Sequence, residues 1–331
     1  MAGAGVEGHN RVHPAWAPGM YYVKQINDKE WLGFGAYARF GNSCQFRPGT
    51  MAGMNNTSSK LNGMSIGVNY AKKLDSKWSA SFGAEVNYAW LQIDKSAYNV
   101  PTVKAQIEGE SYALGWNAAV NYAFDDKNEM GVVYRSAVNH SMEANVRETG
   151  LMSGLVAPYG PVTDAYGCVT LPESVMIGYG HKFNDKTRVE LNGTWTRWSR
   201  FDEFPISFNG FPPAENPKNW KDGWRYAIGV EHKLSDKYSL LAGVAHDESA
   251  IPDYPEIGAD FMVPTGTRTT FTIGTQYHDD RQTLALSIGY MKVGDLNIAG
   301  NVNPESHDPY HHAKMYDSYT KLFSISYQYN F

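Results

Sequence analysis

One group of residues in this 331-residue chain could act in acid–base catalysis: the adjacent acids Asp247 and Glu248, which follow His246. Paired carboxylates beside an imidazole can transfer protons in a general acid–base reaction. The acids also stand at the end of an expected strand, where they could simply order the following loop. A structural turn is the simpler interpretation, and we expect no catalytic residue here.

A second group combines three histidines, His307, His311 and His312, with Asp308. Imidazole and carboxylate groups at such spacing can bind a metal ion. No cysteine accompanies them, and neither a G-x-S-x-G nucleophile motif nor a zinc-binding motif occurs in the chain. We therefore expect a polar loop, no metal, no cofactor and no enzyme.

Four cations form a third group, whose chemistry is the binding of a carboxylate. Guanidinium groups hold carboxylates through paired hydrogen bonds, which makes Arg135 and Arg225 candidate ligand-binding residues. The alternative for these two is an ion pair with an acid across the interior, such as Glu85, Glu190 or Glu231, and for Arg135 this alternative is favoured. Lys218 and Lys221 are expected at a rim and are the better candidates for a ligand head group.

Apolar residues also gather in expected loops, where they could bind a hydrophobic molecule. Clusters of exposed apolar side chains mark binding sites. The alternative is a lid in which these side chains pack against neighbouring loops. The candidate ligand-binding residues are Leu151, Leu155, Phe208, Phe211 and Trp220.

The elements that must position these residues are β-strands. In the final segment 322–331, Phe323, Ile325, Tyr327, Tyr329 and Phe331 alternate with serine, glutamine and asparagine. A period of two residues puts all the apolar side chains on one face, as in a strand between lipid and water. Segments 78–90, 224–231, 270–278 and 284–290 alternate in the same way. Charges on the polar face need water, so the apolar face is expected to point outward into lipid.

The connections predict how these strands are arranged. Short polar turns recur about every fifty residues, at 27–29, 75–77, 125–127, 184–186, 235–237 and 279–281. Longer irregular segments lie between them, at about 42–59, 94–104, 150–166, 209–221, 251–266 and 299–316. Short turns at one rim and long loops at the other are typical of bacterial outer-membrane barrels.

Composition agrees with a barrel. Aromatic residues make up 14% of the chain, which suits aromatic girdles at two membrane interfaces. No run of eighteen apolar residues exists, which excludes helical spans, and a net charge of −5 argues against nucleic acid as a partner. Cys44 and Cys168 are expected in loops, either paired or free.

Strand counting yields about thirteen strands, whereas a single-chain bacterial barrel needs an even number. We therefore expect a single barrel domain over residues 1–331 that lacks one upward strand, with residues 1–17 as the remnant of an extracellular loop. The first seventeen residues lack the features of a signal peptide. The alternative is a barrel that closes with one parallel strand pair.

Several motifs, in order, resemble those of the FadL family of outer-membrane transporters for fatty acids and other hydrophobic compounds. They are Tyr134-Arg135-Ser136, Leu171-Pro172-Glu173, Thr194–Phe201 (TWTRWSRF), Lys221–Gly229 (KDGWRYAIG) and Gly243–Pro252 (GVAHDESAIP), where Ala250 replaces the usual proline. The resemblance runs from about Trp16 to Phe331.

This resemblance implies an all-β transmembrane antiparallel β-barrel with about thirteen of fourteen strands, here without the N-terminal hatch. It further implies passive uptake of long-chain fatty acids or similar compounds, and a lateral opening at a kinked strand, for which Gly41 and Asn42 are the candidates. Expected partners are outer-membrane lipids, lipopolysaccharide and, through Phe331, the outer-membrane assembly machinery, with the chain a monomer in the bacterial outer membrane. A general diffusion porin and a surface-binding or adhesion barrel are the alternatives.

Overall fold

The computed structural model describes residues 15–48, 57–97, 100–149, 164–203, 205–208, 218–252, 261–299 and 312–331. In these ranges the chain is all β apart from a single 3-10 turn, η1 (Trp198–Arg200). No helix among the described residues has the length and hydropathy to cross a membrane. The strands are β1 (Gly19–Asn27), β2 (Glu30–Gln45), β3 (Ser58–Lys73), β4 (Trp78–Ala97), β5 (Val100–Ala123), β6 (Asn128–Arg135), β7 (Val138–Thr149), β8 (Asp164–Leu171), β9 (Ser174–Lys182), β10 (Thr187–Thr196), β11 (Ile206–Phe208), β12 (Gly223–Lys233), β13 (Tyr238–Asp247), β14 (Arg268–His278), β15 (Gln282–Val293), β16 (Leu296–Ala299), β17 (His312–Met315) and β18 (Tyr319–Tyr329).

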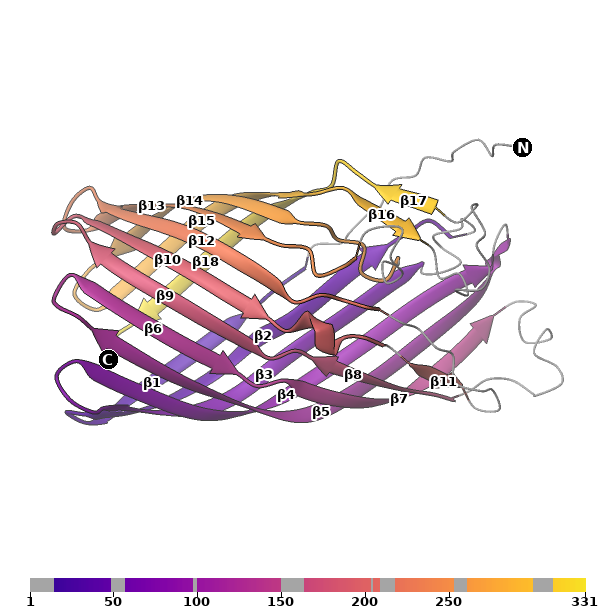
Figure 1. Ribbon diagram of the computed structural model, residues 1–331, viewed down its shortest axis with the longest axis horizontal. Helices are drawn as coiled ribbons and strands as arrows, with labels where there is room; N and C mark the ends of the chain where they lie inside the picture. Colours follow the sequence, from indigo (N-terminus) through magenta and orange to yellow (C-terminus); the bar gives the residue numbers. More distant parts are fainter. Residues whose placement is uncertain are drawn as a thin grey trace.

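One antiparallel sheet wraps into a barrel (Figure 1). Its hydrogen-bonded path is β1-β2-β3-β4-β5-β6-β9-β10-β12-β13-β14-β15-β18, which confirms thirteen strand positions in the described part of the chain. The end strands β1 and β18 also approach each other, because the rings of Tyr22 and Phe331 lie 6.3 Å apart. No backbone ladder joins these two strands in the described residues.

The short turns all lie at one rim and share one geometry. In each turn, a side-chain oxygen of the first residue accepts the backbone N–H of the residue two positions later, as between Asp75 and Lys77 (2.7 Å). The same contact is made by Asn27, Asp125, Asn184, Ser235 and Asp279. Such Asx and Ser turns reverse the chain without tertiary contacts. The predicted short turns are therefore confirmed.

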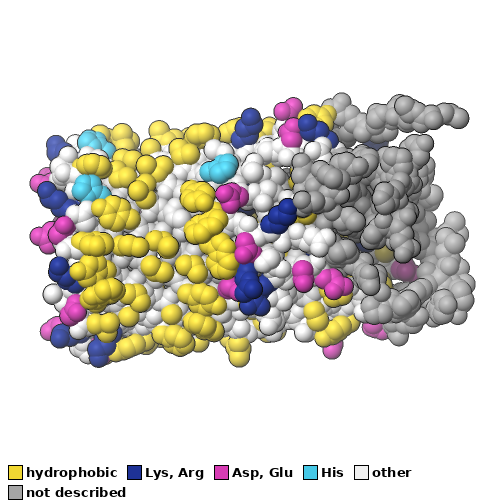
Figure 2. Space-filling view, in the orientation of Figure 1, with side chains coloured by type: hydrophobic (Ala, Val, Ile, Leu, Met, Phe, Trp, Pro, Cys, Tyr) yellow, Lys and Arg dark blue, Asp and Glu magenta, His cyan; other side chains and the backbone are white. Residues whose placement is uncertain are grey.

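The two faces of the sheet differ as predicted. Across β14, β15 and β18 the neighbours Ile273, Ile288 and Phe323 face outward, with 59%, 60% and 72% of their surfaces exposed. On the face shown in Figure 2, hydrophobic side chains gather in a broad belt beside a charged rim. This belt is exposed apolar surface, and in membrane barrels such a surface contacts the hydrocarbon of the lipid.

Three neighbouring strands are interrupted at nearly the same level of the wall. The ladder breaks between β6 and β7, between β8 and β9 at Pro172-Glu173, and after β10, where η1 interrupts the strand before β11. Above the breaks, β7 pairs with β5 and β8, and β8 pairs with β11. Beyond the breaks, β7, β8 and β11 thus form a three-stranded branch of the same sheet, joined to it through β5.

Two predictions about connections are wrong. Segment 94–104 is not a long loop, because β4 and β5 continue to pair up to Ser96 and Lys104. Cys44 and Cys168 lie in β2 and β8 rather than in loops; Cys44 is buried, Cys168 is exposed, and no disulfide joins them.

Candidate ligand-binding site

The inner face of β4 changes character along its length. Near the short turns it carries Ser79 and Ser81, then the buried Glu85 and Asn87, and finally the apolar residues Ala89, Leu91 and Ile93. Because side chains alternate, all of these residues point to the side opposite Trp78, Phe82 and Val86. The inner face of this single strand therefore changes from polar to apolar along its length.

The apolar end belongs to what we call the inner apolar cluster. Residues from β4, β5, β7 and β8 form it, and Phe40 of β2, Phe201 and Phe208 pack against it. Its buried members are Ala89, Ile93, Ile107, Val138, Met142, Val146, Ala165, Val169 and Leu171. Apolar side chains on the inside of a barrel have no role in facing lipid, so they favour an apolar ligand or a packed plug.

Directly beside this cluster lies a charged layer of Tyr37, Arg39, Glu85, Arg135 and Ser136. The Glu85 carboxylate accepts hydrogen bonds from Arg39 and Tyr37 and lies 3.9 Å from the nearest Arg135 nitrogen. Arg135 also donates to the Tyr37 oxygen (2.6 Å). Arg39 donates a second hydrogen bond to the carbonyl of Ser136 (2.5 Å), at the break between β6 and β7. Two guanidinium groups thus share one carboxylate, which leaves the layer with a net positive charge.

Small residues on β5 allow the side chains of β4 and β7 to meet. A Cβ atom on Gly115 would lie 3.0 Å from the Glu85 Oε1 atom and 3.3 Å from the Val138 side chain. One step along the face, Ala113 is opposite Asn87, whose Oδ1 atom lies 2.8 Å from His140 Nε2. The inner face of β5 therefore joins the charged layer to the inner apolar cluster.

A second apolar group, which we call the loop cluster, lies at the rim of the long loops. It contains Cys44, Phe46, Trp220, Ile251, Phe261, Leu296 and Ile298. The Trp220 ring lies 5.1 Å from that of Trp198 and 4.7 Å from that of Phe201. Because Phe201 also packs against the inner apolar cluster, the two apolar regions are continuous.

The predicted cations lie in different surroundings. Arg135 belongs to the charged layer, where the favoured alternative, an ion pair with Glu85, is present. Arg225 instead faces Asp247 at 3.8 Å, and Asp247 also lies 3.6 Å from Arg268. The Lys218 side chain is buried and Lys221 is exposed at the long-loop rim. The structure therefore does not bring the four cations together.

The predicted apolar residues divide in a similar way. Phe208 of β11 packs against the inner apolar cluster and Trp220 is buried in the loop cluster. Leu151, Leu155 and Phe211 lie outside the described residues, as do His307, His311 and Asp308. No group of three or more potential metal ligands occurs among the described residues.

Gly41 and Asn42 pair regularly with Asn62 and Leu61 within β2. The irregularity in this strand is at Arg39, where the register between β2 and β3 shifts. The ladder from β1 to β2 ends at Tyr37, so the bulge begins where β2 loses its partner on that side. A lateral opening here stays a prediction.

Sequence reasoning missed the inner apolar cluster itself. The signal was present in β4, where the inner face turns apolar from Ala89 onward and the outer face turns polar after Trp90, at Gln92 and Asp94. The contribution of β7 and β8 was hidden because the first three residues of segment 164–171, which were expected to belong to a loop, are part of a strand.

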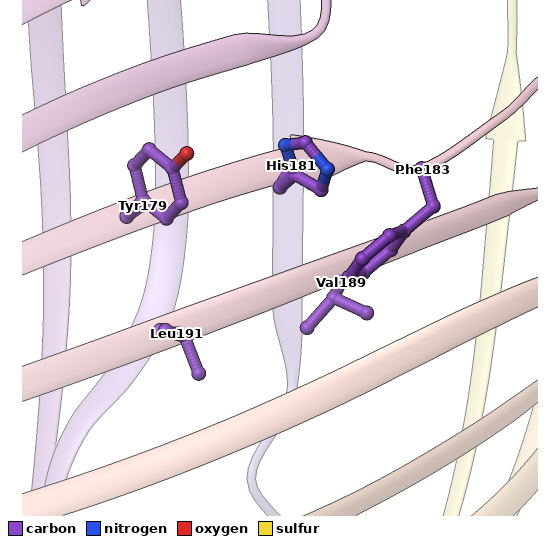
Figure 3. A pocket seen from close by; sticks show the side chains of 5 residues that line it. All are labelled: Tyr179, His181, Phe183, Val189 and Leu191. Atoms are coloured by element: carbon purple, nitrogen blue, oxygen red, sulfur yellow. The ribbon is translucent and has the colours of Figure 1, made fainter.

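One apolar groove lies on the outside of the barrel. Figure 3 shows its side chains: Tyr179, His181 and Phe183 from β9 and its end, with Val189 and Leu191 from β10. The His181 Nδ1 atom and the Tyr179 hydroxyl both hydrogen-bond to Asn128 Oδ1, at 2.7 and 2.6 Å. These residues share the face of the hydrophobic belt, so the groove belongs to the lipid-facing surface.

Fold and interior together define a class: a transmembrane β-barrel with tight turns at one rim, an outer hydrophobic belt and an inner face that carries an apolar cluster next to a positive layer. The sequence matches the family model of outer membrane protein transport proteins (OMPP1/FadL/TodX) over residues 2–331. The chain belongs to this family and is a bacterial outer-membrane protein.

Individual relatives agree with the family assignment. Outer membrane protein P1 of Haemophilus influenzae is 24% identical over 330 residues, covering 88% of this chain and 68% of that protein. The long-chain fatty acid transport protein of Escherichia coli K12 is 22% identical over 339 residues, covering 90% and 75%. The chain therefore spans about two thirds to three quarters of the length of these relatives.

Solved structures show the same fold. A Pseudomonas aeruginosa FadL homologue superposes with a TM-score of 0.81 at 17% identity, covering 96% of this chain and 78% of that one. The Pseudomonas putida toluene transporter TodX superposes with a TM-score of 0.67 at 15% identity, covering 97% and 86%.

Proposed function

We propose that this protein takes up long-chain fatty acids, or similar compounds with an apolar tail and an acidic head, by passive diffusion across the outer membrane. The observation that carries the proposal is that the inner apolar cluster lies beside the charged layer, since a Cβ atom at Gly115 would touch both Glu85 and Val138. A fatty acid has the same two parts in the same order.

Arg135 is the residue that we assign to the carboxylate head. Its side chain is 40% exposed, whereas those of Arg39 and Glu85 are 6% and 1% exposed. Arg39 and Glu85 are already paired within the wall, so Arg135 is the cation of this layer that a ligand can reach. Guanidinium groups can form paired hydrogen bonds to a carboxylate.

The tail would lie against Val138, Met142 and the aromatic rings of Phe40 and Phe208. Entry is proposed through the loop cluster, where Trp220 packs and where Lys218 and Lys221 could attract an anion. Exit through the wall near Gly41 and Asn42 would use the end of the β1–β2 ladder. Lipopolysaccharide and outer-membrane lipids would surround the barrel, and Phe331 would serve as the assembly signal of a monomer.

The alternative of a general diffusion porin fits the interior less well. A porin lumen is water-filled and polar, whereas nine buried apolar residues from four strands face inward here. An apolar interior favours an apolar solute. Flux of small sugars into liposomes that contain the protein would support the porin instead.

The test compares Arg135→Met with Arg188→Met. Arg188 is also an inner-face arginine paired with acids, Glu129 and Glu190, but it lies near the short turns, away from the inner apolar cluster. Binding of oleate and of its methyl ester to the purified protein would be measured by displacement of a fluorescent fatty acid.

We expect Arg135→Met to weaken oleate binding at least tenfold, because a charge-assisted hydrogen bond contributes about 1.5–3 kcal/mol. Binding of the ester should change little, and Arg188→Met should leave both unchanged. An equal loss for the acid and the ester would contradict the assignment of Arg135. Failure of every apolar ligand to bind would refute the proposed function.

A further inference from the structure

One buried polar side chain in the inner apolar cluster is not accounted for by the binding of a carboxylate. His140 lies on the inner face of β7 between Val138 and Met142, and only 1% of its surface is exposed. Its two ring nitrogens are in different situations. Nε2 lies 2.8 Å from Asn87 Oδ1, and Nδ1 has no hydrogen-bond partner among the described residues.

The neighbouring hydrogen bonds determine which ring nitrogen carries the proton. The Asn87 amide donates through Nδ2 to Ser65 Oγ at 2.8 Å. Its Oδ1 atom is consequently the group that faces His140, and a carbonyl oxygen can only accept. The neutral imidazole must therefore hold its proton on Nε2, and Nδ1 carries a lone pair.

A buried lone pair without a donor is unusual, because nearly all buried polar atoms in proteins are hydrogen-bonded. The side chains beside Nδ1 on the same strand face, Val138 and Met142, have no donor to offer. The complement of this site is a molecule with an apolar body and an O–H group. A carboxylate is the wrong chemistry, because its oxygens also present lone pairs.

We propose that His140 is the hydrogen-bond acceptor for apolar ligands that carry a hydroxyl group, such as long-chain alcohols. This inference rests on the proposed function, since it places such ligands in the same inner apolar cluster. It adds a second specificity: Arg135 selects carboxylates, and His140 selects hydroxyls. The compounds that the barrel admits then include uncharged alcohols, whose hydroxyl group would bind to the acceptor on His140 and not to the cation of Arg135.

The test uses the purified full chain and two probes of similar shape, 1-dodecanol and dodecyl methyl ether. The alcohol donates a hydrogen bond and the ether cannot. Both would compete with a fluorescent fatty acid, and oleate would be measured in parallel. We expect the wild-type protein to bind the alcohol about three- to tenfold more tightly than the ether, as one neutral hydrogen bond provides.

Replacing the imidazole of His140 tests whether this side chain is the hydrogen-bond acceptor. His140→Phe keeps a ring of similar size and should remove the preference for the alcohol while leaving the affinity for the ether within about twofold. The matched control is His181→Phe on the outer face, which should keep the preference. Heat-dependent migration on a denaturing gel shows whether each variant is folded, and the wild-type comparison does not depend on any variant.

Several outcomes would overturn the proposal. Equal binding of alcohol and ether by the wild type would do so, as would a preference that survives in His140→Phe. A water molecule that stays on Nδ1 in a crystal structure with the alcohol bound would also overturn it. If oleate binds while the alcohol and ether are equivalent, only this inference fails; if oleate does not bind either, the proposed function fails with it.

Discussion

At the scale of single residues, the interior is dominated by Glu85. Its side chain is 1% exposed and neutralises Arg39, which is 6% exposed, while Arg135 remains partly accessible. Charges this deeply buried are tolerated only when they are paired and hydrogen-bonded. The pair therefore holds β2 and β4 together across β3 and also positions Arg135 through Tyr37.

Removing the charge of Glu85 should be costly. Glu85→Gln leaves the Arg39 guanidinium buried without its counter-ion, and breaking such a pair costs about 3–5 kcal/mol. Urea unfolding in lipid vesicles, followed by tryptophan fluorescence, measures the change. The double variant Glu85→Leu with Arg39→Met should recover much of the loss, and a single variant that unfolds like the wild type would show that the pair is not buried in solution.

At the scale of elements, every short turn has the same hydrogen bond from a backbone N–H to a side-chain oxygen, but this oxygen belongs to a carboxylate, an amide or a hydroxyl group. Asp279 caps the turn after β14 and Asn184 caps the turn after β9. Hydrogen bonds from the backbone N–H of Arg281 and from Gln282 lower the pKa of Asp279 from 3.8 to about 2. An asparagine cap makes equivalent bonds but does not titrate.

The two turns should therefore respond differently to acid. The lowered pKa means that the ionised Asp279 stabilises the fold fully above about pH 4, the unfolded value, and that this stabilisation is lost as the pH falls through about 2. Asp279→Ala should lower the unfolding temperature at pH 7 and have a much smaller effect near pH 2, where most of the stabilisation by the carboxylate is lost. Asn184→Ala should lower it equally at both values, and a constant effect of Asp279→Ala would contradict the proposed cause.

At the scale of the whole molecule, the outer belt requires hydrocarbon around it. Ile273 lies near the middle of β14 and faces outward, so Ile273→Arg should destabilise the folded barrel by about 2–4 kcal/mol in lipid vesicles. Ser324→Arg is the matched control, because Ser324 faces inward on β18 and its arginine would lie in the lumen. Unfolding titrations measure both, and an equal cost would mean that the two faces have been assigned the wrong way round.

The sequence was sufficient to predict the strands and turns of the barrel and insufficient to predict the inner apolar cluster. Turns such as 125–127 and the alternation of segment 78–90 are local properties, so residue types alone predicted them. The two apolar clusters depend on contacts between distant segments, such as that of the Phe40 ring, which packs against the inner apolar cluster, with the Trp198 ring, which packs against the loop cluster, at 6.4 Å between centroids. The bond from Arg39 to Ser136 likewise joins residues far apart in the chain, and no local pattern indicates it.

The self-contained turns have a consequence for how the barrel forms. Each of them closes a hairpin through contacts within four consecutive residues, so the chain entropy lost at that end is small. Pairing can then start at the short-turn end of every hairpin and proceed toward the rim of the long loops, with the distant contacts between aromatic rings made last. The barrel should consequently form its strand pairs early and the contacts of its inner apolar cluster late.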